Sequence, residues 1–508
     1  MNPTALLNRI CRAMYRAEYR RYQRPCDIRT IQTGHLMQLL RNNAETVYGR
    51  KCGFAEIRSY KDFAANVPLT VYEDYAPYIE QIAAGKQHIL TAEPVLLFEP
   101  TSGSSGGRKL IPYTQSLKAE FQRGIRPWIC DLYTKIPGLT AGKSYWSITP
   151  VTAGKEYSTG GISIGFEDDA AYFGRLEQRL MRRIFAVDGS VKYASDIQVF
   201  YRETGRQLLH CGRLSMISVW NPTFLTILCD AIRADADLLT DDLPAKRKQT
   251  VRQALKKNRF DLVFPGLRLI SCWADGSAAD DIAPLQARFP GIMIQPKGLL
   301  STECFAAFPL VGNEGSYLSI YSHFFEFRDL QSGEICTADQ VREQEYELIV
   351  TTGGGFYRYC TGDIVRILHT EPNRPPRLKF LRRSGIASDL CGEKLTDAFV
   401  RNVCQALGIA ADFCLLAPEG KHYILYTTTA AGIGDDTLDQ ALCESYHYAY
   451  CRKLGQLGKA EIRHVAADAD RLYLEHLTEQ GMRLGDIKPA FLSKRSGWDA
   501  VFRSRDDS

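Results

Sequence analysis

Short apolar runs alternate with helical patterns through the middle of the chain, and this alternation constrains the fold more than any other feature. The clearest strand candidates are Leu214–Trp220, Leu267–Cys272 and Ile292–Gln295, and helical patterns at Thr223–Ala234 and Lys246–Lys257 separate the first two. Strands that alternate with helices predict an α/β architecture with a parallel sheet. The 508 residues exceed one typical domain, so we expect at least two domains.

The pattern changes towards the C-terminus. A more β-rich part comprises Tyr317–Phe327, Tyr346–Thr352 and Val365–Leu368, and a Pro-rich turn follows at Pro372–Pro376. Beyond Arg383, helical and strand patterns begin again. We therefore predict a large N-terminal domain, residues 1–383, with α/β sheets and a β-rich part, followed by a small α+β domain, residues 384–508, which could act as a lid.

Composition argues against several classes of protein. The formal net charge of +5 is small for this length, which speaks against nucleic acid or an anionic membrane as the main partner. No apolar run approaches the roughly 18 residues that a membrane-spanning helix needs. The fifteen cysteines form no CxxC pair, which argues against a zinc site or a disulfide framework. Free thiols suit a reducing cytosol, so we expect a cytoplasmic protein.

The N-terminus has two interpretations. Arginines recur there at helical spacing beside apolar residues, namely Arg9, Arg12, Arg16 and Arg20 beside Leu6, Ile10 and Met14. An organelle transit peptide can have this composition. We favour a surface helix that ends before Pro25, because arginines four residues apart face solvent readily.

A cluster of small residues gives the strongest chemical signal. The segment Thr101-Ser102-Gly103-Ser104-Ser105-Gly106-Gly107-Arg108-Lys109 follows a predicted strand and precedes a predicted helix. Its backbone N–H groups and hydroxyls could therefore bind a phosphate chain. It is not a Walker A loop, because Arg108 replaces the glycine before the lysine and Leu110 replaces the Ser/Thr after it. A flexible surface loop is the alternative that composition alone leaves open.

Two further segments fit a nucleotide site. Ser301-Thr302-Glu303 offers a hydroxyl for an α-phosphate and a carboxylate for Mg²⁺. Asp363 closes the segment Tyr357–Asp363 directly after Gly362, where a carboxylate could accept both hydroxyls of a ribose. Read alone, Glu303 also fits an ordinary surface carboxylate, and Asp363 also fits a plain turn acid.

Together these segments resemble, in order and spacing, the core motifs of the acyl-adenylate-forming superfamily that includes firefly luciferase and acyl-CoA synthetases. The closer resemblance is to the Gretchen Hagen family of auxin-responsive acyl acid amido synthetases, which has bacterial relatives. It extends from about Ile31 to the C-terminal lysine region. The shared motifs include Asn43–Gly49, Val67–Leu69, Leu110–Pro112, Ser271–Ser277, Phe324–Phe327, Tyr346–Leu348 and Gly392–Leu395.

The resemblance implies roles in the large domain, with ATP and Mg²⁺ as cofactors. Thr302 would contact the α-phosphate, Glu303 would bind Mg²⁺ and Asp363 would hold the ribose. Arg383 would lie near the hinge. The other nucleotide-binding residues implied are Ser102, Gly103, Ser104, Ser105 and Gly106, which would wrap the phosphates, and Ser301.

Two lysines of the small domain also match the family. Lys394 matches a lysine that can reach the nucleotide, and Lys488 resembles the C-terminal lysine that stabilises charge during adenylation. A mobile lysine suits this chemistry, because pentavalent phosphate accumulates negative charge only transiently. Either residue could instead be an ordinary exposed lysine, and only its place in the motif distinguishes it.

The chain also departs from the family pattern. Leu299 stands where a tyrosine usually stacks on adenine, so adenine must pack elsewhere or against aliphatic groups. The residues of the acyl pocket cannot be transferred, because they vary with the substrate. Phe121, Arg123 and Trp128 fit pocket walls, but we favour ordinary packing for them.

Three functions remain open at this point. The leading one is an amido synthetase, a ligase that converts a carboxylic acid and ATP into acyl-AMP and pyrophosphate, after which an amine, such as that of an amino acid, attacks. An acyl-CoA or carrier-protein ligase would share the first step and use a thiol. A non-catalytic nucleotide-binding scaffold is a third possibility, against which the joint presence of Glu303, Asp363 and Lys488 argues.

Overall fold

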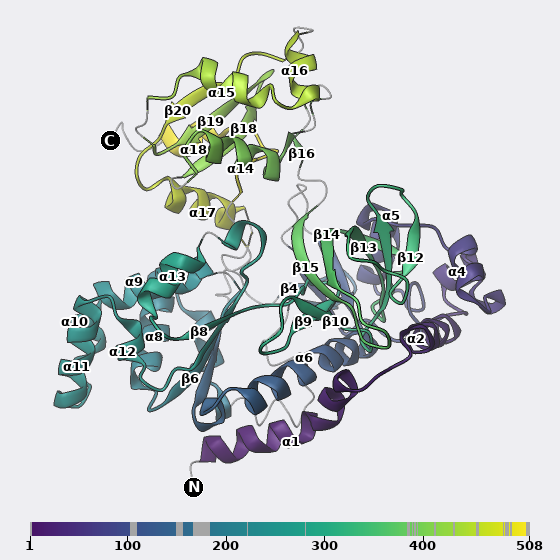
Figure 1. Ribbon diagram of the computed structural model, residues 1–508, viewed down its shortest axis with the longest axis horizontal. Coiled ribbons are helices and arrows are strands. Elements are labelled where there is room, and N and C mark those ends of the chain that lie inside the picture. The colour runs from purple at the N-terminus through teal and green to yellow at the C-terminus, as the bar shows by residue number, and fades with distance from the viewer. Residues whose placement is uncertain are drawn as a thin grey trace. The chain divides into compact units, whose positions relative to one another are not determined.

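The structure is a computed structural model that forms two compact units (Figure 1). The first comprises Met1–Thr101 and Arg108–Leu381, and the second contains the residues from Arg382 onward. Among the described residues, no helix has both the length and the apolar character to cross a membrane. The description covers the whole chain except residues 1–2, 102–108, 149–155, 166–182, 221, 280, 384–386, 389, 391–392, 394, 411–412, 430–431, 454–456, 481, 483–486, 488–489 and 504–508.

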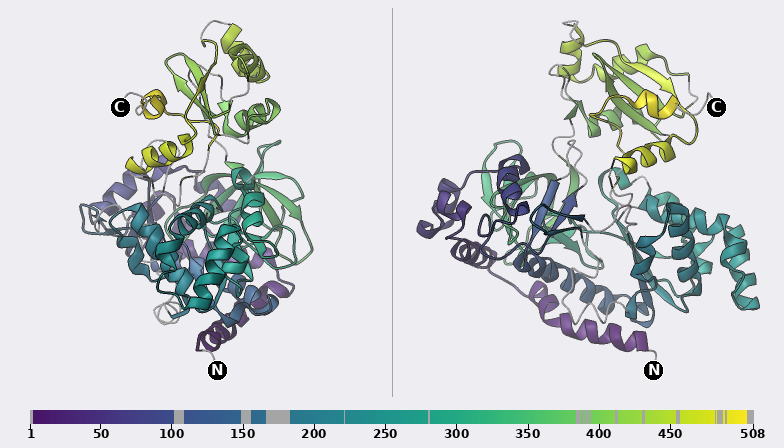
Figure 2. Two further views of the ribbon diagram at one scale, coloured as in Figure 1. Left: turned by 90° about the vertical axis from the view of Figure 1, so that its left-hand side faces the viewer. Right: turned by 180° about the vertical axis from the view of Figure 1, so that it is seen from behind.

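A parallel sheet forms one part of the first unit and confirms the predicted α/β alternation. Its strands lie in the order β3 (Lys143–Trp146), β6 (Leu214–Ser218), β7 (Leu269–Cys272) and β8 (Met293–Pro296). The helices between these strands gather beside the sheet in both the front and the back view (Figures 1 and 2). They are α8 (Ile197–His210), α9 (Pro222–Ala234), α10 (Ala236–Leu239), α11 (Ala245–Lys256), α12 (Phe260–Val263) and α13 (Ile282–Arg288).

The β-rich part of the first unit contains two further sheets. One has the order β2-β1-β5-β4, formed by β1 (Leu97–Thr101), β2 (Lys109–Tyr113), β4 (Glu156–Tyr157) and β5 (Ser163–Ile164). The other is largely antiparallel, in the order β12-β11-β13-β14-β15-β10-β9. Its strands are β9 (Ala307–Pro309), β10 (Ser316–Leu318), β11 (Phe324–Asp329), β12 (Ile335–Thr337), β13 (Glu345–Thr351), β14 (Tyr359–His369) and β15 (Arg377–Arg383).

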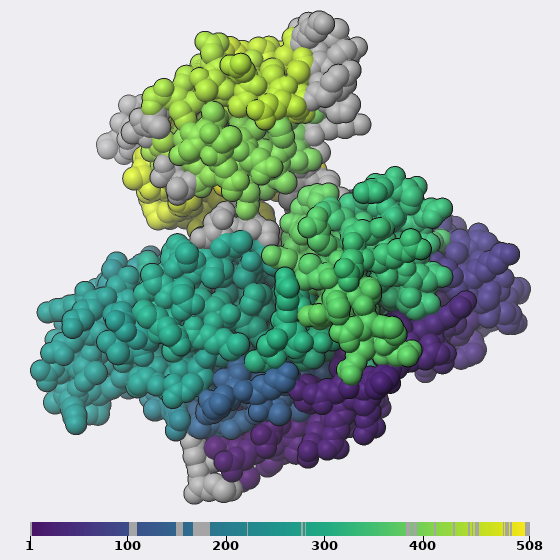
Figure 3. All heavy atoms as spheres, in the orientation of Figure 1, coloured from purple at the N-terminus to yellow at the C-terminus, as the bar shows by residue number. Residues whose placement is uncertain are grey.

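The N-terminal helix α1 (Pro3–Gln23) ends before Pro25, as predicted, and packs along α6 (Gln115–Lys135) (Figure 3). Its buried face differs from the expected one. Leu6, Ile10 and Met14 are exposed, whereas the face towards the protein carries Asn8, Cys11, Tyr15, Tyr19 and Tyr22. Polar partners explain the difference, because the Tyr19 hydroxyl donates to Asp131 at 2.7 Å and Asn8 Nδ2 donates to the Thr140 carbonyl at 2.9 Å.

The stretch Ile31–Tyr48, which has a helical pattern in the sequence, belongs to two helices. Helix α2 (Ile28–Asn42) ends at the cap Asn43, and α3 (Val47–Lys51) begins after Thr46, whose hydroxyl accepts the Gly49 N–H at 2.9 Å. This local cap competes with continuation of the helix. The remaining helices of the first unit that the structure describes are α4 (Tyr60–Asn66) and α5 (Tyr72–Ala83).

The second unit has a small α+β fold. Its sheet has the order β18 (Cys414–Glu419), β19 (His422–Thr427), β20 (Glu461–His464), and a short ladder joins β16 (Ala387–Ser388) to β17 (Leu395–Thr396). Buried side chains such as Leu416, Leu425 and Leu442 form its core. The helices are α14 (Asp397–Ala406), α15 (Asp435–Leu442), α16 (Tyr446–Lys453), α17 (Ala469–Glu479) and α18 (Trp498–Arg503).

Candidate active site

A tight turn carries Ser301, Thr302 and Glu303. Leu300 bridges Phe305, the Ser301 N–H donates to the Cys304 carbonyl at 3.0 Å, and the Ala306 N–H donates to the Leu299 carbonyl at 3.0 Å. The chain therefore turns back on itself with Thr302 and Glu303 at the tip. Leu299 is buried in the core beneath the tip.

The tip is fixed by two buried tyrosines. The Tyr113 hydroxyl, at the end of β2, donates to the Thr302 carbonyl at 2.7 Å, and the Tyr359 hydroxyl lies 3.5 Å from a carboxylate oxygen of Glu303. Glu303 is only 4% exposed, so it is not the surface carboxylate that the sequence left open. A buried carboxylate held beside a strand end is suited to bind a cation.

Asp363 belongs to the same neighbourhood. It lies in β14, is 6% exposed, and follows Gly362, whose φ of +74° favours glycine. Its N–H donates to the Thr361 hydroxyl at 3.1 Å. Burial raises the pKa of the Cys304 thiol, and the carboxylates of Glu303 and Asp363 both add to that shift. Two buried carboxylates that are sixty residues apart in the sequence therefore act electrostatically on the same buried thiol.

Strands β1 and β2 flank the small-residue segment. They pair antiparallel with Thr101 opposite Lys109, so a strand follows the segment directly, and the expected helix, α6, begins only after that strand. The predicted strand-to-helix arrangement therefore missed one strand. Burial raises the pKa of Tyr72, whose hydroxyl accepts the Leu110 N–H at 2.8 Å, and Glu303 contributes to the shift. Ser102, Gly103, Ser104, Ser105 and Gly106 lie outside the described residues.

A buried polar cluster, not anticipated from the sequence, joins three segments of the site. Glu120 of α6 lies 2.9 Å from Nδ1 of His323 and 3.1 Å from Nε2 of His35, and its carboxylate accepts the Gly353 N–H at 2.8 Å. Nε2 of His323 accepts the Phe305 N–H at 2.9 Å. An accepting Nε2 carries no proton, so the ring is neutral with its proton on Nδ1.

The pKa shift of His323 agrees with a neutral ring. Burial alone would raise the pKa of Glu120, but the adjacent His323 and His35 lower it to about 2. Burial lowers the pKa of His323. The Glu120–His323 cluster therefore links α6 to the arm of the Thr302–Glu303 turn and to the turn after β13.

A second buried ion pair positions the start of β14. Arg358 adopts a left-handed backbone with φ of +49°, and its guanidinium donates to both carboxylate oxygens of Glu326 at 2.9–3.1 Å. It also donates to the Ala64 and Val67 carbonyls at 3.0 Å. These bonds hold a backbone conformation that a non-glycine residue rarely adopts. The sequence motif contained Arg358, but spacing alone did not indicate a role for it.

A cavity adjoins the turn inside the first unit. It lies where β3, β6 and β8 end, a position at which open parallel sheets commonly bind ligands. Its lining residues are Phe121, Ile125, Trp128, Trp146, Ser147, Ser218, Trp220, Lys297, Gly298, Leu300, Phe305, Ala307, Phe308 and Pro309. Phe121 and Trp128 belong to the hydrophobic core, as favoured above, and they also line this cavity. Arg123 donates to the Tyr321 carbonyl at 3.1 Å.

In the second unit, the structure describes several neighbours in sequence of the two candidate lysines, Lys394 and Lys488. The buried carboxylate of Glu393 accepts hydrogen bonds from the Leu390 N–H and the Tyr423 hydroxyl. Ile487 is buried, and Asp397 accepts the Phe491 N–H at 2.7 Å. Lys394 and Lys488 themselves lie outside the described residues, as does the side chain of Arg383, whose backbone ends β15.

Comparison with known proteins identifies the family. Residues 25–259 match the GH3 family N-terminal domain, residues 316–383 its central domain and residues 394–497 its C-terminal domain. The chain belongs to the GH3 family. GH3 is the Gretchen Hagen family that the sequence motifs resemble, so the match confirms that resemblance.

Individual GH3 proteins are similar over most of the chain. An indole-3-acetic acid-amido synthetase, GH3.8 of Oryza sativa subsp. indica, is 24% identical over 80% of this chain and 73% of its own. GH3.3 of Arabidopsis thaliana, with the same named activity, is 24% identical over 79% and 74%. A solved acyl acid amido synthetase, GH3.15 in complex with 2,4-DB, superposes with a TM-score of 0.79 at 19% identity, covering 98% and 96% of the two chains. This GH3 chain therefore shares that mixed α/β fold.

The GH3 family matches do not cover one part of the candidate site. Asp363 lies within the central-domain match, and Lys394 and Lys488 lie within the C-terminal match. Residues 260–315, which include Lys297, Thr302 and Glu303, lie between the matched segments. Their assignment rests on the turn, the two tyrosines and the cavity described above.

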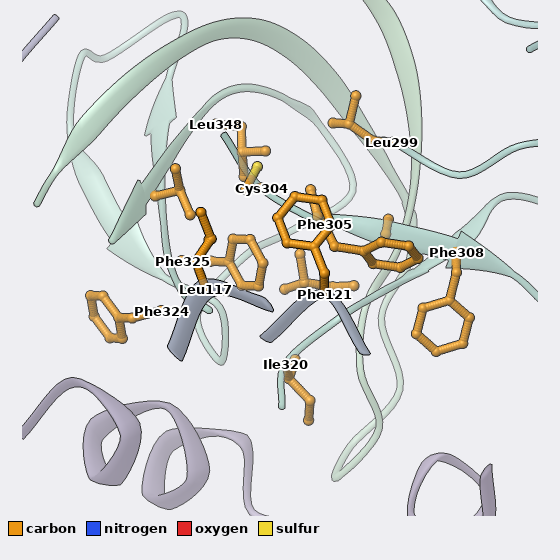
Figure 4. Close-up of a cluster of buried hydrophobic side chains, with 14 of the residues drawn as sticks. Leu117, Phe121, Leu299, Cys304, Phe305, Phe308, Ile320, Phe324, Phe325 and Leu348 are labelled. Carbon is orange, nitrogen blue, oxygen red and sulfur yellow. The ribbon is translucent and has the colours of Figure 1, made fainter. Parts of the chain in front are cut away.

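Helix α6 packs closely against the ring of Phe305 at Gly124. The rings of Phe121 and Phe305 lie beside each other, 6.2 Å between centroids (Figure 4), and a Cβ at Gly124 would lie 2.1 Å from Phe305 Cδ1. We expect Gly124→Ala to lower the free energy of unfolding by about 1–3 kcal/mol, because the ring must move. Denaturant unfolding measures this change.

Gly34→Ala is the matched control for this substitution. Gly34 also lies inside a helix, α2, but a Cβ added there would have no other atom within 4 Å. We expect Gly34→Ala to raise stability by about 0.5–1 kcal/mol through helix propensity alone. Equal effects of the two substitutions would contradict a steric role for Gly124.

Proposed function

We propose that this GH3 chain is an ATP-dependent acyl acid amido synthetase. It activates a carboxylic acid as acyl-AMP with release of pyrophosphate, and an amine, that of an amino acid, then attacks the acyl carbon and AMP leaves. The observation that carries the proposal is that buried Glu303 and Asp363 both act on the Cys304 thiol, in a turn whose two arms line a cavity with aromatic side chains. Family membership supports it, because the curated GH3 relatives named above are amido synthetases.

The described residues fit ATP and Mg²⁺. Mg²⁺ in proteins usually takes one or two carboxylates together with phosphate oxygens, and Glu303 offers a buried carboxylate at the tip of the turn. Glu303 would hold the ion, which would neutralise charge on the phosphates. Asp363 would accept the ribose hydroxyls, Thr302 would contact the α-phosphate, and Ser102–Gly106 with Ser301 would bind the phosphate chain.

The protein contributes mainly position and charge. No side chain needs to be acylated, because the adenylate is already the activated species. The Thr302–Glu303 turn, tied to α6 through Phe305 and His323, holds its groups in a fixed place and therefore needs little reorganisation during reaction. We propose that residues 384–508 form a lid that brings Lys394 and Lys488 to the nucleotide in turn, with Arg383 near its hinge.

The products of turnover test this proposal. We expect carboxylate-dependent and Mg²⁺-dependent exchange of labelled pyrophosphate into ATP, followed by formation of AMP and an amide when amino acids are added. Release of ADP and phosphate would contradict adenylation. Faster transfer of the acyl group to coenzyme A than to every amine tested would assign the chain to the thioester ligases instead.

A further inference from the structure

A lysine and three tryptophans meet in the cavity. Nζ of Lys297 lies 5.2 Å from the ring centroid of Trp128, 5.7 Å from Trp146 and 5.0 Å from Trp220. The same Nζ donates to the Ser218 hydroxyl at 2.7 Å. Lys297 is 7% exposed. The cavity wall therefore contains one buried ammonium surrounded by aromatic faces.

Four of the five side chains, all except Trp220, lie at strand ends or on a packed helix. Trp146 ends β3, Ser218 ends β6, Lys297 directly follows β8, and Trp128 lies in α6, where its indole N–H donates to Gln295 at 3.0 Å. The Lys297 N–H donates to the Cys272 carbonyl at 2.8 Å. Side chains on strand ends and a packed helix keep their positions better than side chains on loops, so the group is suited to recognise a ligand.

The Thr302–Glu303 turn determines which end of a ligand would meet Lys297. Lys297, Gly298 and Leu300 on one arm, and Phe305, Ala307 and Phe308 on the other, line the cavity, whereas the tip residues do not. Lys297 precedes Thr302 by five residues, which corresponds to at most about 18 Å of extended chain. An acid whose carboxylate reaches the tip would therefore direct the far end of its acyl group towards Lys297.

We propose that Lys297 makes the site selective for acids with a flat ring and a second hydrogen-bond acceptor, such as a hydroxyl or an anionic group, at the end remote from the carboxylate. Trp128, Trp146 and Trp220 supply faces for the ring, and the ammonium donates to the distal acceptor. This inference rests on the proposed function, because it names the acid class that the same enzyme would activate.

The chemistry favours this class over purely aliphatic acids. A methylene chain in the cavity would offer no acceptor to the Lys297 ammonium, which is a donor group and already donates to the Ser218 hydroxyl. Sites built to hydrogen-bond a substrate group reject analogues that lack it, more strongly than apolar pockets distinguish a methylene. The aromatic lining and the ammonium thus favour the same ligand.

Matched acids test the inference on the full-length protein. The probes are 3-(4-hydroxyphenyl)propanoate, 3-phenylpropanoate and 3-cyclohexylpropanoate, compared by kcat/KM for pyrophosphate exchange. We expect the hydroxylated acid to exceed the phenyl acid by about 10-fold or more, since bonds to charged donors are strong, and the phenyl acid to exceed the cyclohexyl acid. Lys297→Met should remove the first preference, and Lys297→Arg should retain part of it.

Binding without turnover gives a second readout. Trp128, Trp146 and Trp220 are three of the five tryptophans in the chain, so titration with each acid alone should change the intrinsic fluorescence. Lys192→Met is the matched control, because Lys192 is also buried against an aromatic ring, Tyr193, but is not part of the cavity lining. We expect this control to leave the preference for the hydroxylated acid unchanged.

The outcomes separate the two proposals. Acceptor-dependent binding without pyrophosphate exchange by any acid would support the selectivity and contradict the proposed function. Exchange that proceeds equally well with all three acids would overturn the selectivity. An equal loss with every acid in Lys297→Met, in a variant with unchanged thermal unfolding, would also overturn it, because Lys297 would then contact the carboxylate that is activated.

Discussion

Replacing Glu303 with glutamine is expected to slow adenylate formation by at least about 10²-fold. The amide keeps the shape of the carboxylate but removes its charge, so it would bind Mg²⁺ poorly. Removing one group that stabilises transition-state charge commonly lowers kcat by 10²–10³-fold. The measurement is the rate of pyrophosphate exchange at saturating acid and ATP, over a range of Mg²⁺ concentrations.

The exposed residue Glu314 provides the control for this substitution. Its side chain lies at the surface between β9 and β10, so Glu314→Gln should leave the exchange rate at that of the parent protein. Glu303→Gln should also keep its fold, because Tyr359 can donate to an amide oxygen as it does to the carboxylate. A folded Glu303→Gln protein with normal exchange would exclude Glu303 as the metal ligand.

Replacing Glu120 with alanine is expected to lower the free energy of unfolding by about 3–5 kcal/mol. Loss of the carboxylate leaves the Gly353 N–H without its buried acceptor and removes the acceptor group that lies 2.9 Å from Nδ1 of His323, and each buried donor left unsatisfied costs about 1–3 kcal/mol. Urea unfolding measures the change. Because the cluster also positions Phe305, we expect adenylation to weaken with it.

The same cluster predicts a loss of stability in acid. The folded pKa of Glu120 is about 2 against an ordinary 4.5, so its contribution of about 3 kcal/mol is complete above pH 4.5 and disappears as pH falls towards 2. The pKa of His323 is also lowered, from 6.5, so the unfolded state gains a proton first as pH falls below 6.5. Both pKa values are lower in the folded state, so both groups reduce stability as the pH falls. The Glu120→Ala protein lacks the contribution of Glu120 and should therefore lose less stability on acidification.

Glu93→Ala tests whether the expected loss of stability in Glu120→Ala depends on burial of the carboxylate. Glu93 is exposed and accepts the Ser116 N–H at 2.9 Å in the first turn of α6, so it contacts the same helix as Glu120. We expect its loss to cost about 1 kcal/mol, as for an exposed helix-terminal hydrogen bond. An effect of Glu120→Ala no larger than that of Glu93→Ala would show that the buried cluster contributes little to stability.

Local sequence patterns predicted the parallel sheet well and individual helix ends less well. Strands β6 and β7 coincide with apolar runs of the sequence, and every residue of the two strands is buried. Such runs can be recognised from the sequence alone. The break between α2 and α3 depends on the Thr46 cap, a single hydroxyl inside a helical pattern. The apolar pattern of Lys109–Tyr113 is too short to distinguish a strand from a helix. The segment is a strand because it pairs with β1.

Residue order alone indicated the GH3 family, which the family matches confirm, and it predicted roles for Thr302, Glu303 and Asp363 because these residues lie in short motifs that follow one another along the chain. Only the tertiary structure showed the Glu120–His323 cluster, the Arg358–Glu326 pair and the tryptophans around Lys297. Their members are 32 to 203 residues apart, and no local periodicity records such pairs. Burial by other segments gives these groups their partners and their shifted pKa values, and burial is a property of the folded chain.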